Sequence, residues 1–366
     1  MRIVWCSWKD RSHPAAGGAE VVSDELAKRL VLDGHEVIML VGGYPGASHE
    51  DSRNGYKIIR VGGRITVYYR AWRYYRKHLQ GWPDLVIDEC NTIPFFAGWY
   101  SGAPTIMFFH MLCHNIWFYE MRFPFSLFGY LAEPIYLHML RRSPVITVSE
   151  STKADLLRYG MDPDDIHIIS EGIEIEPVTD LSKIEKFPDP TVLSLGSMRS
   201  MKRTLDQVKA FEIAKQRLPN LKMIVAGDTS GHYAHNVLKY IAHSPHEADI
   251  DVRGRVSKDV KTELMQRSHL LMVTSVKEGW GLVVTEAASQ GTPSVVYDVD
   301  GLRDSVKHEQ TGLISTQSTP IGLASVLAQA LTDKQLYDNL RKTGWDWNKS
   351  VTFKQSYDDI KQILNI

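Results

Sequence analysis

The sequence predicts an α/β protein with two doubly wound domains, and three observations support this prediction. The chain has 366 residues, which exceeds the size of one ordinary core and suits two. Short apolar stretches alternate with helical stretches in both halves, as parallel strands joined by crossover helices do. An acidic stretch with several prolines separates the two halves, so we expect the linker at residues 171–190.

The N-terminal half begins with a short apolar stretch at 2–8, which predicts a buried parallel strand. Apolar residues then recur at helical spacing, and Gly34 is placed to end that helix. Residues 35–40 predict the next strand, which completes a strand–helix–strand unit. Further strands are expected at 85–88, 105–109 and 145–148, and a helix follows Ser149 and ends at Gly160.

The C-terminal half repeats this rhythm and ends in an amphipathic helix at 351–366. Its strands are expected at 192–196, 223–227, 250–253, 270–274, 294–297 and 312–314. We therefore expect an N-terminal domain over 1–170, with the helix 351–366 packing back on it, and a C-terminal domain over 171–350. Ligands of such sheets bind beyond the carboxyl ends of the strands, so functional residues should follow strands.

Composition excludes several classes of protein. The chain is 43% hydrophobic and 23% charged with a net charge of -1, which argues against nucleic acid as a main partner. Three cysteines without paired spacing give neither a disulfide framework nor a zinc site. The first residues are too short an apolar run for a signal peptide, and no stretch approaches the ~20 apolar residues that span a bilayer. We expect a cytoplasmic protein, soluble or resting on a membrane surface.

A glycine-containing loop between a strand and a helix is the sharpest chemical signal. Gly279 and Gly281 let the chain approach a ligand, and the helix should begin near Leu282. Glu278 then precedes the helix and Glu286 lies in its first turns. Free N–H groups at the helix start favour phosphate, so flanking carboxylates suit a nucleotide sugar. The alternative is an ordinary helix start with acidic residues that favour the helix dipole.

Two further sets of residues follow predicted strands. Arg199 and Lys202 could neutralise a diphosphate leaving group, or they could form a solvated basic helix start with Arg203. Gly17 and Gly18 lie between a strand and a helix, where they could border a ligand or form an ordinary turn. The chain has no Gly-x-Gly-x-x-Gly in this loop, so a dinucleotide site is poorly supported.

The combination of these segments strongly resembles family 4 retaining glycosyltransferases of the GT-B fold. The resemblance implies two Rossmann-like domains that face each other across a cleft holding the active site. It rests on Glu278-Gly279-Trp280-Gly281 with Glu286, and on further segments along nearly the whole chain: Gly17-Gly18-Ala19-Glu20, Ser149-Glu150-Ser151, Glu171-Gly172-Ile173, Gly196-Ser197-Met198-Arg199 with Lys202, Val225-Ala226-Gly227-Asp228, Gly301-Leu302-Arg303-Asp304 and Thr311-Gly312-Leu313.

The resemblance implies a role for each residue of the donor loop. Glu286 matches the glutamate that holds the ribose hydroxyls of the donor, and Glu278 matches the one beside the donor sugar. The backbone N–H groups around Gly281 and Leu282 would meet the distal phosphate. The expected donor-binding residues of this loop are Glu278, Gly279, Trp280, Gly281, Leu282 and Glu286.

The resemblance also implies the remaining site. Arg199 and Lys202 would stabilise the leaving diphosphate, although the family often separates these two residues further, so Arg203 could replace Lys202. Gly17 and Gly18 would lie beside the donor phosphates. A histidine near the reacting centre corresponds to His110, with His114 as the alternative. We count His110, Glu278, Arg199 and Lys202 as the catalytic residues, and we expect no metal and no cofactor.

Aromatic and basic residues are mixed in residues 64–82, which begin with Arg64 and end with Trp82. This mixture suits an anionic membrane surface or stacking on a sugar or nucleic acid, and it also fits a helix that packs its aromatics on the N-terminal domain. A second aromatic stretch follows at 116–130. The hypothesis is an acceptor on, or carried by, the cytoplasmic face of a membrane.

The sequence therefore predicts transfer of a hexosyl unit from a UDP- or GDP-sugar to a glycan, lipid-linked or small-molecule hydroxyl, with retention implied by the resemblance. One alternative is a nucleotide-sugar epimerase of the same fold, which needs no acceptor. Another is a non-catalytic partner subunit that has kept the fold. An oxidoreductase that binds a dinucleotide is disfavoured by the missing glycine fingerprint.

Overall fold

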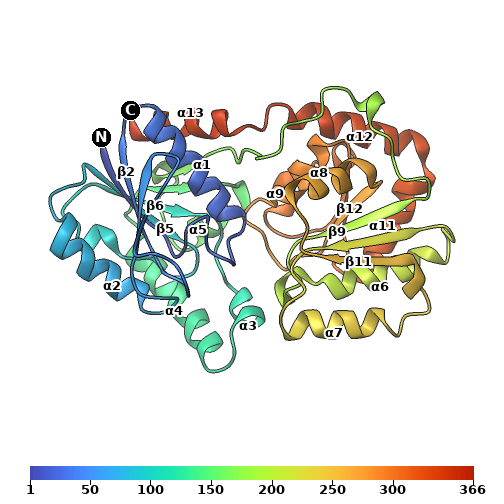
Figure 1. The fold of residues 1–366 in the computed structure, drawn as a ribbon, viewed down its shortest axis with the longest axis horizontal. Coiled ribbons are helices and arrows are strands. Elements are labelled where there is room, and N and C mark those ends of the chain that lie inside the picture. Colours follow the sequence, from blue (N-terminus) through green and yellow to red (C-terminus); the bar gives the residue numbers. More distant parts are fainter. The chain divides into compact units, whose positions relative to one another are not determined.

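The computed structural model describes residues 1–366 and divides into two units (Figure 1). Unit 1 comprises residues 1–114, 128–172 and 353–366, and unit 2 comprises 115–127 and 173–352. Residues 115–127, which the expected boundaries place in the N-terminal domain, belong with unit 2. The reason is that helix α3 (Ile116–Glu120) packs against the short 3-10 turn η5 (Ser200–Lys202) of that unit.

Unit 1 is built on one sheet of eight strands, in the order β3-β4-β2-β1-β5-β6-β7-β8. The chain starts in the middle of this sheet and builds outward in both directions, so the order reverses between β1 and β5. All neighbours are parallel except β3, which is antiparallel to β4. The strands are β1 Arg2–Cys6, β2 Glu36–Val41, β3 Glu50–Arg53, β4 Tyr56–Arg60, β5 Leu85–Cys90, β6 Thr105–Phe109, β7 Val145–Thr147 and β8 Ile166–Ile168.

The hairpin of β3 and β4 is missing from the sequence prediction. Its turn is formed by Asn54 and Gly55, with φ angles of 50° and 90°, a pair that commonly turns antiparallel strands. The polar strand β3 has no buried residue, so it carries no apolar pattern that could reveal it. The short strand β8 at the other edge was also not predicted.

The helices of unit 1 cover both faces of its sheet. Helix α2 packs on Val4 and Val86, and helix α4 packs on Cys90 and Phe109. Val4 pairs with Val86 and Cys90 with Phe109 in the strand register, so α2 and α4 cover the same face. The helices are α1 Gly18–Leu32, α2 Val67–Tyr74 with the π-turn η1 Tyr75–Leu79, α4 Phe125–Met139, α5 Glu150–Arg158 and α13 Phe353–Leu364.

The last helix, α13, packs against α1 of unit 1, as the amphipathic pattern of the C-terminus suggested. Its Phe353 and Ile360 are buried, and the hydroxyl of Tyr357 donates a hydrogen bond to Asp33 over 2.9 Å. Both chain termini therefore lie in unit 1 (Figure 1).

Unit 2 contains a parallel sheet of six strands in the order β11-β10-β9-β12-β13-β14. Its first strand, β9, lies in the middle, and the order reverses between β9 and β12. The predicted strands of this unit agree with the structure to within one residue at every end. They are β9 Thr191–Leu195, β10 Lys222–Ala226, β11 Ile250–Gly254, β12 Leu270–Val273, β13 Ser294–Tyr297 and β14 Gly312–Ser315.

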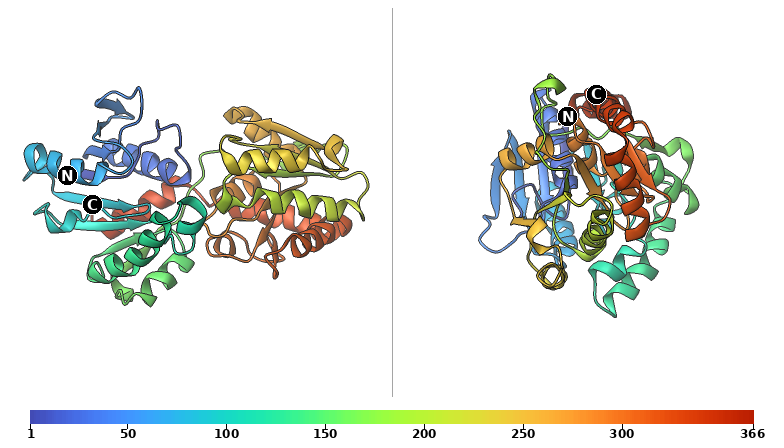
Figure 2. Two further views of the ribbon diagram at one scale, coloured as in Figure 1. Left: turned by 90° about the horizontal axis from the view of Figure 1, so that it is seen from below. Right: turned by 90° about the vertical axis from the view of Figure 1, so that its right-hand side faces the viewer.

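Two apolar clusters fill the two faces of this second sheet. One joins Val192 and Met223 to α6, α7 and α11, and the other joins Leu193 and Ile224 to α8, α9 and α10. Successive strand residues point to opposite faces, which gives three layers that can be followed in Figure 2. The helices are α6 Thr204–Lys215, α7 His232–Ile241, α8 Lys258–Arg267, α9 Leu282–Ser289, α10 Leu302–Ser305, α11 Pro320–Thr332 and α12 Lys334–Asn348.

The remaining short 3-10 turns are η2 Ala97–Trp99, η3 Pro163–Asp165, η4 Leu181–Lys183 and η6 Glu247–Asp249. No helix in the chain has both the length and the apolar content to cross a bilayer. The chain therefore forms two α/β units with parallel sheets, each with one point at which the strand order reverses, and this is where ligands of doubly wound sheets bind.

Candidate active site

In unit 2, two loops meet where the strand order reverses between β9 and β12. The Thr274 hydroxyl, after β12, lies 2.9 Å from the carbonyl oxygen of Lys202, and the Val276 N–H donates to the Met201 carbonyl over 2.8 Å. These hydrogen bonds hold the loop after β12 beside the loop after β9. Two segments more than 70 residues apart in sequence are thereby brought together.

A close backbone contact holds Glu278 in this loop. The Glu278 N–H donates to the carbonyl of Asp300 over 3.0 Å. Gly301 has a φ of 78°, and a Cβ atom at this position would lie 2.4 Å from the Glu278 carbonyl oxygen. Only glycine fits this left-handed and crowded position without displacing Glu278. The segment Gly301-Leu302-Arg303-Asp304 therefore has a structural task in the site.

All four charged residues predicted for the donor lie in unit 2, and each one has a partner of opposite charge. Lys202 forms an ion pair with Glu278, and the Ser275 hydroxyl donates to the same carboxylate. The Nζ atom of Lys261, on α8, lies 2.6 Å from Oε2 of Glu286.

Arg199 completes this set, with its Nη1 atom 3.6 Å from Oε2 of Glu120 on α3. Exposure increases along the set: the side chain of Glu286 is 9% exposed, that of Glu278 12% and that of Arg199 52%. The cations predicted for the diphosphate are therefore the more accessible members.

The donor loop runs into α9, which begins at Leu282 as the sequence predicts. Gly281, with a φ of 96°, precedes the helix, and no side chain caps it, so the first-turn N–H groups suit an anion. Trp280 lies beside Trp347, with ring centroids 6.4 Å apart. The structure thus gathers Glu278, Gly279, Trp280, Gly281, Leu282 and Glu286 with Arg199 and Lys202 in unit 2.

In unit 1, Gly17 and Gly18 begin helix α1, in the loop after β1. The Gly17 N–H donates to Oε2 of Glu20 over 2.6 Å, and Lys9 lies 3.4 Å from the same oxygen. The resemblance implies that the Gly17 amide lies beside a donor phosphate, but in the structure this amide is bonded to a carboxylate of its own helix. Burial raises the pKa of Glu20, against the opposing effect of Lys9.

His110 follows β6 in unit 1 and lies between two buried carboxylates. Its Nε2 is 3.3 Å from Oε1 of Glu89, and its Nδ1 is 3.6 Å from Oε1 of Glu171. Burial disfavours the charged ring, but Glu171 and Glu89 outweigh this effect and raise the pKa of His110 to about 10. The two carboxylates therefore favour the protonated imidazole, which can donate hydrogen bonds from both ring nitrogens.

Glu89 and Glu171 were not predicted as site residues. Glu89 directly follows the strand predicted at 85–88, lies near the end of β5, and accepts hydrogen bonds from Trp5 and Ser23, each over 2.7 Å. A charged residue at the end of a buried strand was the signal that could have identified it. Glu171 belongs to a segment that carries the resemblance, but its contact with His110 is visible only in the folded chain.

The alternative histidine, His114, is directed elsewhere in unit 1. Its Nε2 lies 3.3 Å from Asp155 of α5, and its ring is next to that of Tyr159. The structure therefore places His110, and not His114, with the buried carboxylates at the reversal point of the first sheet.

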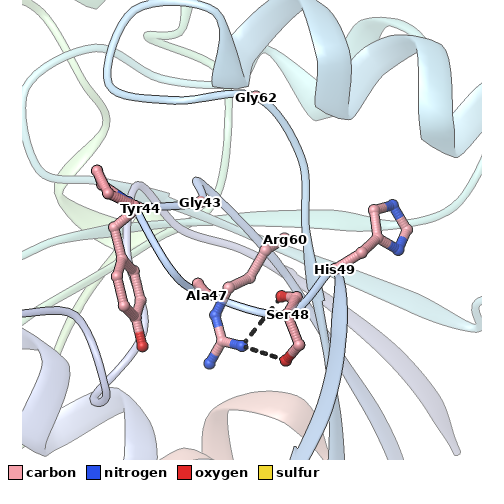
Figure 3. Close-up of a pocket in the computed structure, with 8 residues that line it drawn as sticks. Gly43, Tyr44, Ala47, Ser48, His49, Arg60 and Gly62 are labelled. Atoms are coloured by element: carbon pink, nitrogen blue, oxygen red, sulfur yellow. Dashed lines mark hydrogen bonds between the residues drawn. The ribbon is translucent and has the colours of Figure 1, made fainter.

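Loops after β2 and β4 of unit 1 line an open hollow of about 410 Å³ (Figure 3). Arg60 lines it, but this guanidinium already donates to Asp10 over 2.7 and 3.1 Å and to Asp51 over 3.0 Å. With its cation neutralised, the hollow offers hydroxyl, carbonyl and aromatic groups, which suit a hydroxyl-rich ligand. Its lining residues are Gly43, Tyr44, Pro45, Ala47, Ser48, His49, Arg60 and Gly62.

Two family models cover almost the whole chain. Residues 16–177 match the model described as Glycosyltransferase Family 4, and residues 179–347 match the one described as Glycosyl transferases group 1. The chain belongs to family 4 of the glycosyltransferases. A relative over nearly its full length is N-acetyl-alpha-D-glucosaminyl L-malate synthase of Bacillus anthracis, with 23% identity across 95% of this chain and 94% of the relative.

Solved structures show that this glycosyltransferase has the GT-B fold. Sucrose-phosphate synthase from Thermosynechococcus elongatus matches with a TM-score of 0.81 and 17% identity, over 100% of this chain and 98% of the other. HepE of Anabaena, in complex with UDP-glucose, matches with a TM-score of 0.74 and 16% identity, over 100% and 99%. The two family models and the glycosyltransferase relatives show that the chain is a transferase enzyme that moves a glycosyl group.

Proposed function

We propose that this glycosyltransferase moves a hexosyl unit from a UDP- or GDP-sugar to an acceptor hydroxyl, with retention at the anomeric carbon. One observation supports the donor class above all: Arg199, Lys202, Glu278 and Glu286 surround the glycine loop and the uncapped start of α9. Cations with helix N–H groups match a diphosphate, and the carboxylates match hydroxyls on either side of it. The UDP-glucose of the HepE complex belongs to the same donor class.

The charges of unit 2 fit a leaving diphosphate. As the bond from the anomeric carbon to the diphosphate breaks, its electron pair stays on the phosphate oxygen, where Arg199 and Lys202 stabilise the charge. The acceptor oxygen bonds to the same face of the sugar, and its proton passes to the departing phosphate oxygen. Lys202 must release Glu278 for this role, and Glu278 is then free to bind sugar hydroxyls.

Donor binding is tested by calorimetric titration of the protein with UDP, GDP and ADP. We expect UDP or GDP to bind with a micromolar dissociation constant and ADP to bind more weakly. Turnover of the matching nucleotide sugar in excess EDTA should be unchanged, because the two cations replace a metal. Failure of all three nucleotides to bind would refute the donor proposal, and loss of activity restored by Mg²⁺ would refute the metal-free site.

A transferase releases nucleotide only when an acceptor is present, whereas an epimerase interconverts the donor sugar alone. Release of free UDP or GDP is therefore measured with and without an acceptor extract fractionated into lipid and water-soluble parts. We expect release to depend on one fraction. Conversion of the donor sugar without any acceptor would favour the epimerase.

The acceptor, we infer further, is carried on the cytoplasmic face of an anionic membrane. Helix α4 presents an apolar stripe to solvent along one side, with Glu133 as its only acidic residue and that one buried. His138 and Arg142 are exposed beside the end of the stripe. The stripe consists of Phe128 (70% exposed), Leu131 (57%), Ile135 (62%) and Met139 (53%), at helical spacing.

Helix α2 adds positive charge to the same side of unit 1, because α2 and α4 cover the same face of the sheet. Part of the predicted aromatic and basic stretch packs inward, as Tyr75 is fully buried. Tyr69 and Trp72 are exposed, however, together with Arg70, Arg73, Arg76 and Lys77. An apolar stripe beside a basic helix fits an anionic lipid surface better than a neutral one.

Co-sedimentation with vesicles of phosphatidylglycerol and phosphatidylcholine tests this surface. Replacing Phe128, Leu131 and Ile135 by serine should abolish binding to the anionic vesicles at low salt. The matched control is Leu32→Ser on α1, an isolated exposed leucine of the same unit. Wild-type protein that stays in the supernatant, or a triple variant that still sediments, would refute the membrane proposal and leave the donor proposal intact.

A further inference from the structure

Helix α3 (Ile116–Glu120) contacts the cations predicted for the donor phosphates. The Glu120 carboxylate lies 3.6 Å from Arg199, and the Tyr119 hydroxyl accepts a hydrogen bond from Arg203 over 3.2 Å. The Arg203 guanidinium also lies 5.9 Å from the centroid of the Tyr119 ring. None of the segments that carry the family resemblance includes α3, and neither Tyr119 nor Glu120 is among the residues predicted to bind the donor.

Glu120 is a half-buried carboxylate, with 26% of its side chain exposed, and one of its two oxygens is poorly satisfied. Its Oε2 atom meets Arg199, but its Oε1 atom is inaccessible to solvent and has no hydrogen-bond partner. A carboxylate oxygen without a partner in a buried position is unfavourable. Arg199 is the more exposed member of the pair, so water screens their attraction. The contact leaves one oxygen of Glu120 without a partner and binds Arg199 only weakly, so a ligand can replace it easily.

We propose that Glu120 is an internal counter-ion of the donor's diphosphate site, which neutralises Arg199 until a nucleoside diphosphate displaces it. This inference rests on the proposed donor class. A diphosphate carries more charge and more acceptor oxygens than one carboxylate. It therefore binds Arg199 more strongly than Glu120 does and displaces the carboxylate. Glu120 is thus a positioning residue: it holds α3 against η5 in the empty site and releases it when the donor binds.

Tyr119 gives the exchange a second contact. Arg203 has a left-handed φ of 50° and precedes α6, so its backbone position is set by the fold. Tyr119 then holds only the end of the Arg203 side chain. The Tyr119 hydroxyl is neutral, so its hydrogen bond with Arg203 anchors α3 without competing with phosphate for a cation. The charged Glu120 carboxylate does compete with phosphate, for Arg199.

The test is a double-mutant cycle on UDP or GDP binding, whichever the wild-type enzyme binds. Glu120→Gln keeps the shape and removes the charge, so the nucleotide should bind about threefold more tightly than to wild type. In an Arg199→Ala background, Glu120→Gln should leave the dissociation constant unchanged, because the cation for which the two anions compete is gone. Glu247→Gln, in the turn η6 of the same unit, is the matched control and should have no effect.

Kinetics provides a second measurement that a merely structural role would not change in this way. Glu120→Gln should lower KM for the nucleotide sugar while kcat stays within about twofold, and raised salt should reduce the difference between the variants. Equal or weaker binding by Glu120→Gln, or the same gain in the Arg199→Ala background, would overturn the proposal. If wild-type protein binds no nucleotide at all, the donor proposal itself has failed and the counter-ion proposal fails with it.

Discussion

The charged side chains at the two points of strand reversal differ in their burial and in how firmly their partners are fixed. In unit 1, His110 and Glu89 are buried, with side-chain exposures of 8% and 0%, and their partners are set by the fold. In unit 2, Arg199 and Lys202 are exposed by 52% and 28%, and each is paired with a carboxylate that a ligand could replace. The first arrangement is preorganised, and the second is exchangeable.

Under the proposed function, the two arrangements would have different tasks in one reaction. A charge that stabilises a transition state is most effective when it is already fixed, because no reorganisation is then needed. Charges that bind and release a substrate in each turnover must instead change partners at little cost. The contrast predicts different consequences for variants in the two units. Two concern activity and binding and two concern stability, and within each pair the larger expected effect comes first.

The largest effect is expected for His110→Gln in unit 1. Loss of the fixed positive charge should lower kcat by about 100- to 1,000-fold, as for the removal of one preorganised electrostatic group. Nucleotide binding to unit 2, measured by calorimetry, should stay within about twofold. His35→Gln is the control, because this histidine lies at the surface of unit 1, where its ring contacts the N-terminal amine. A kcat close to wild type would remove His110 from the catalytic residues.

A smaller effect, on binding, is expected for Glu286→Ala in unit 2. Loss of charge-assisted hydrogen bonds to the donor should weaken UDP or GDP binding by about 30-fold, which corresponds to about 2 kcal/mol. Glu263→Ala is the control, because Glu263 is an exposed glutamate of α8 that pairs with Arg267. Unchanged nucleotide affinity of Glu286→Ala would indicate a non-catalytic scaffold instead of a donor site.

Gly301→Ala tests how the backbone holds Glu278. Its Cβ would collide with the Glu278 carbonyl at a position that also has a left-handed φ of 78°. We expect a loss of unfolding free energy of about 2–3 kcal/mol and weaker donor binding. Gly231→Ala has a comparable φ of 98° but open space around the Cβ, so it should lose only about 1 kcal/mol. Equal losses in urea denaturation would contradict the steric explanation.

The second effect on stability is its dependence on pH, which arises from His110 and is small for each unit of pH. Its pKa is raised to about 10 in the folded chain and is about 6.5 in the unfolded one, so the folded state holds the extra proton between these values. The stabilisation is complete below pH 6.5 and is lost as pH rises towards 10. The free energy of unfolding should fall by about 1 kcal/mol per pH unit in this window.

His110→Gln cannot bind this proton, so the difference in unfolding free energy between wild type and variant should shrink from pH 7 to 9. Urea denaturation at each pH measures it, and the subtraction removes the contribution of other titrating groups. A difference that does not change with pH would mean that His110 is neutral in the folded chain.

The local patterns of the chain were sufficient to predict much of the fold. Strand β6 at Thr105–Phe109 and strand β13 at Ser294–Tyr297 coincide with their predictions, because buried parallel strands are short, continuous apolar runs. The start of α9 at Leu282 was also predicted, since glycines ended the preceding loop. The polar edge strand β3 was missed because nothing in it is buried.

The sequence by itself determined the α/β fold and the family, and it predicted the loop around Glu278 and Glu286 as the donor site. Motifs within a single strand–loop–helix segment depend only on local order along the chain. Only the tertiary structure decided the partners: Glu89 and Glu171 for His110, Glu278 for Lys202 and Glu120 for Arg199. The two residues of each pair lie 21 to 79 positions apart in the sequence and come from different elements of the fold. Such contacts, and the burial that shifts a pKa, arise from packing and have no signature in the order of residues.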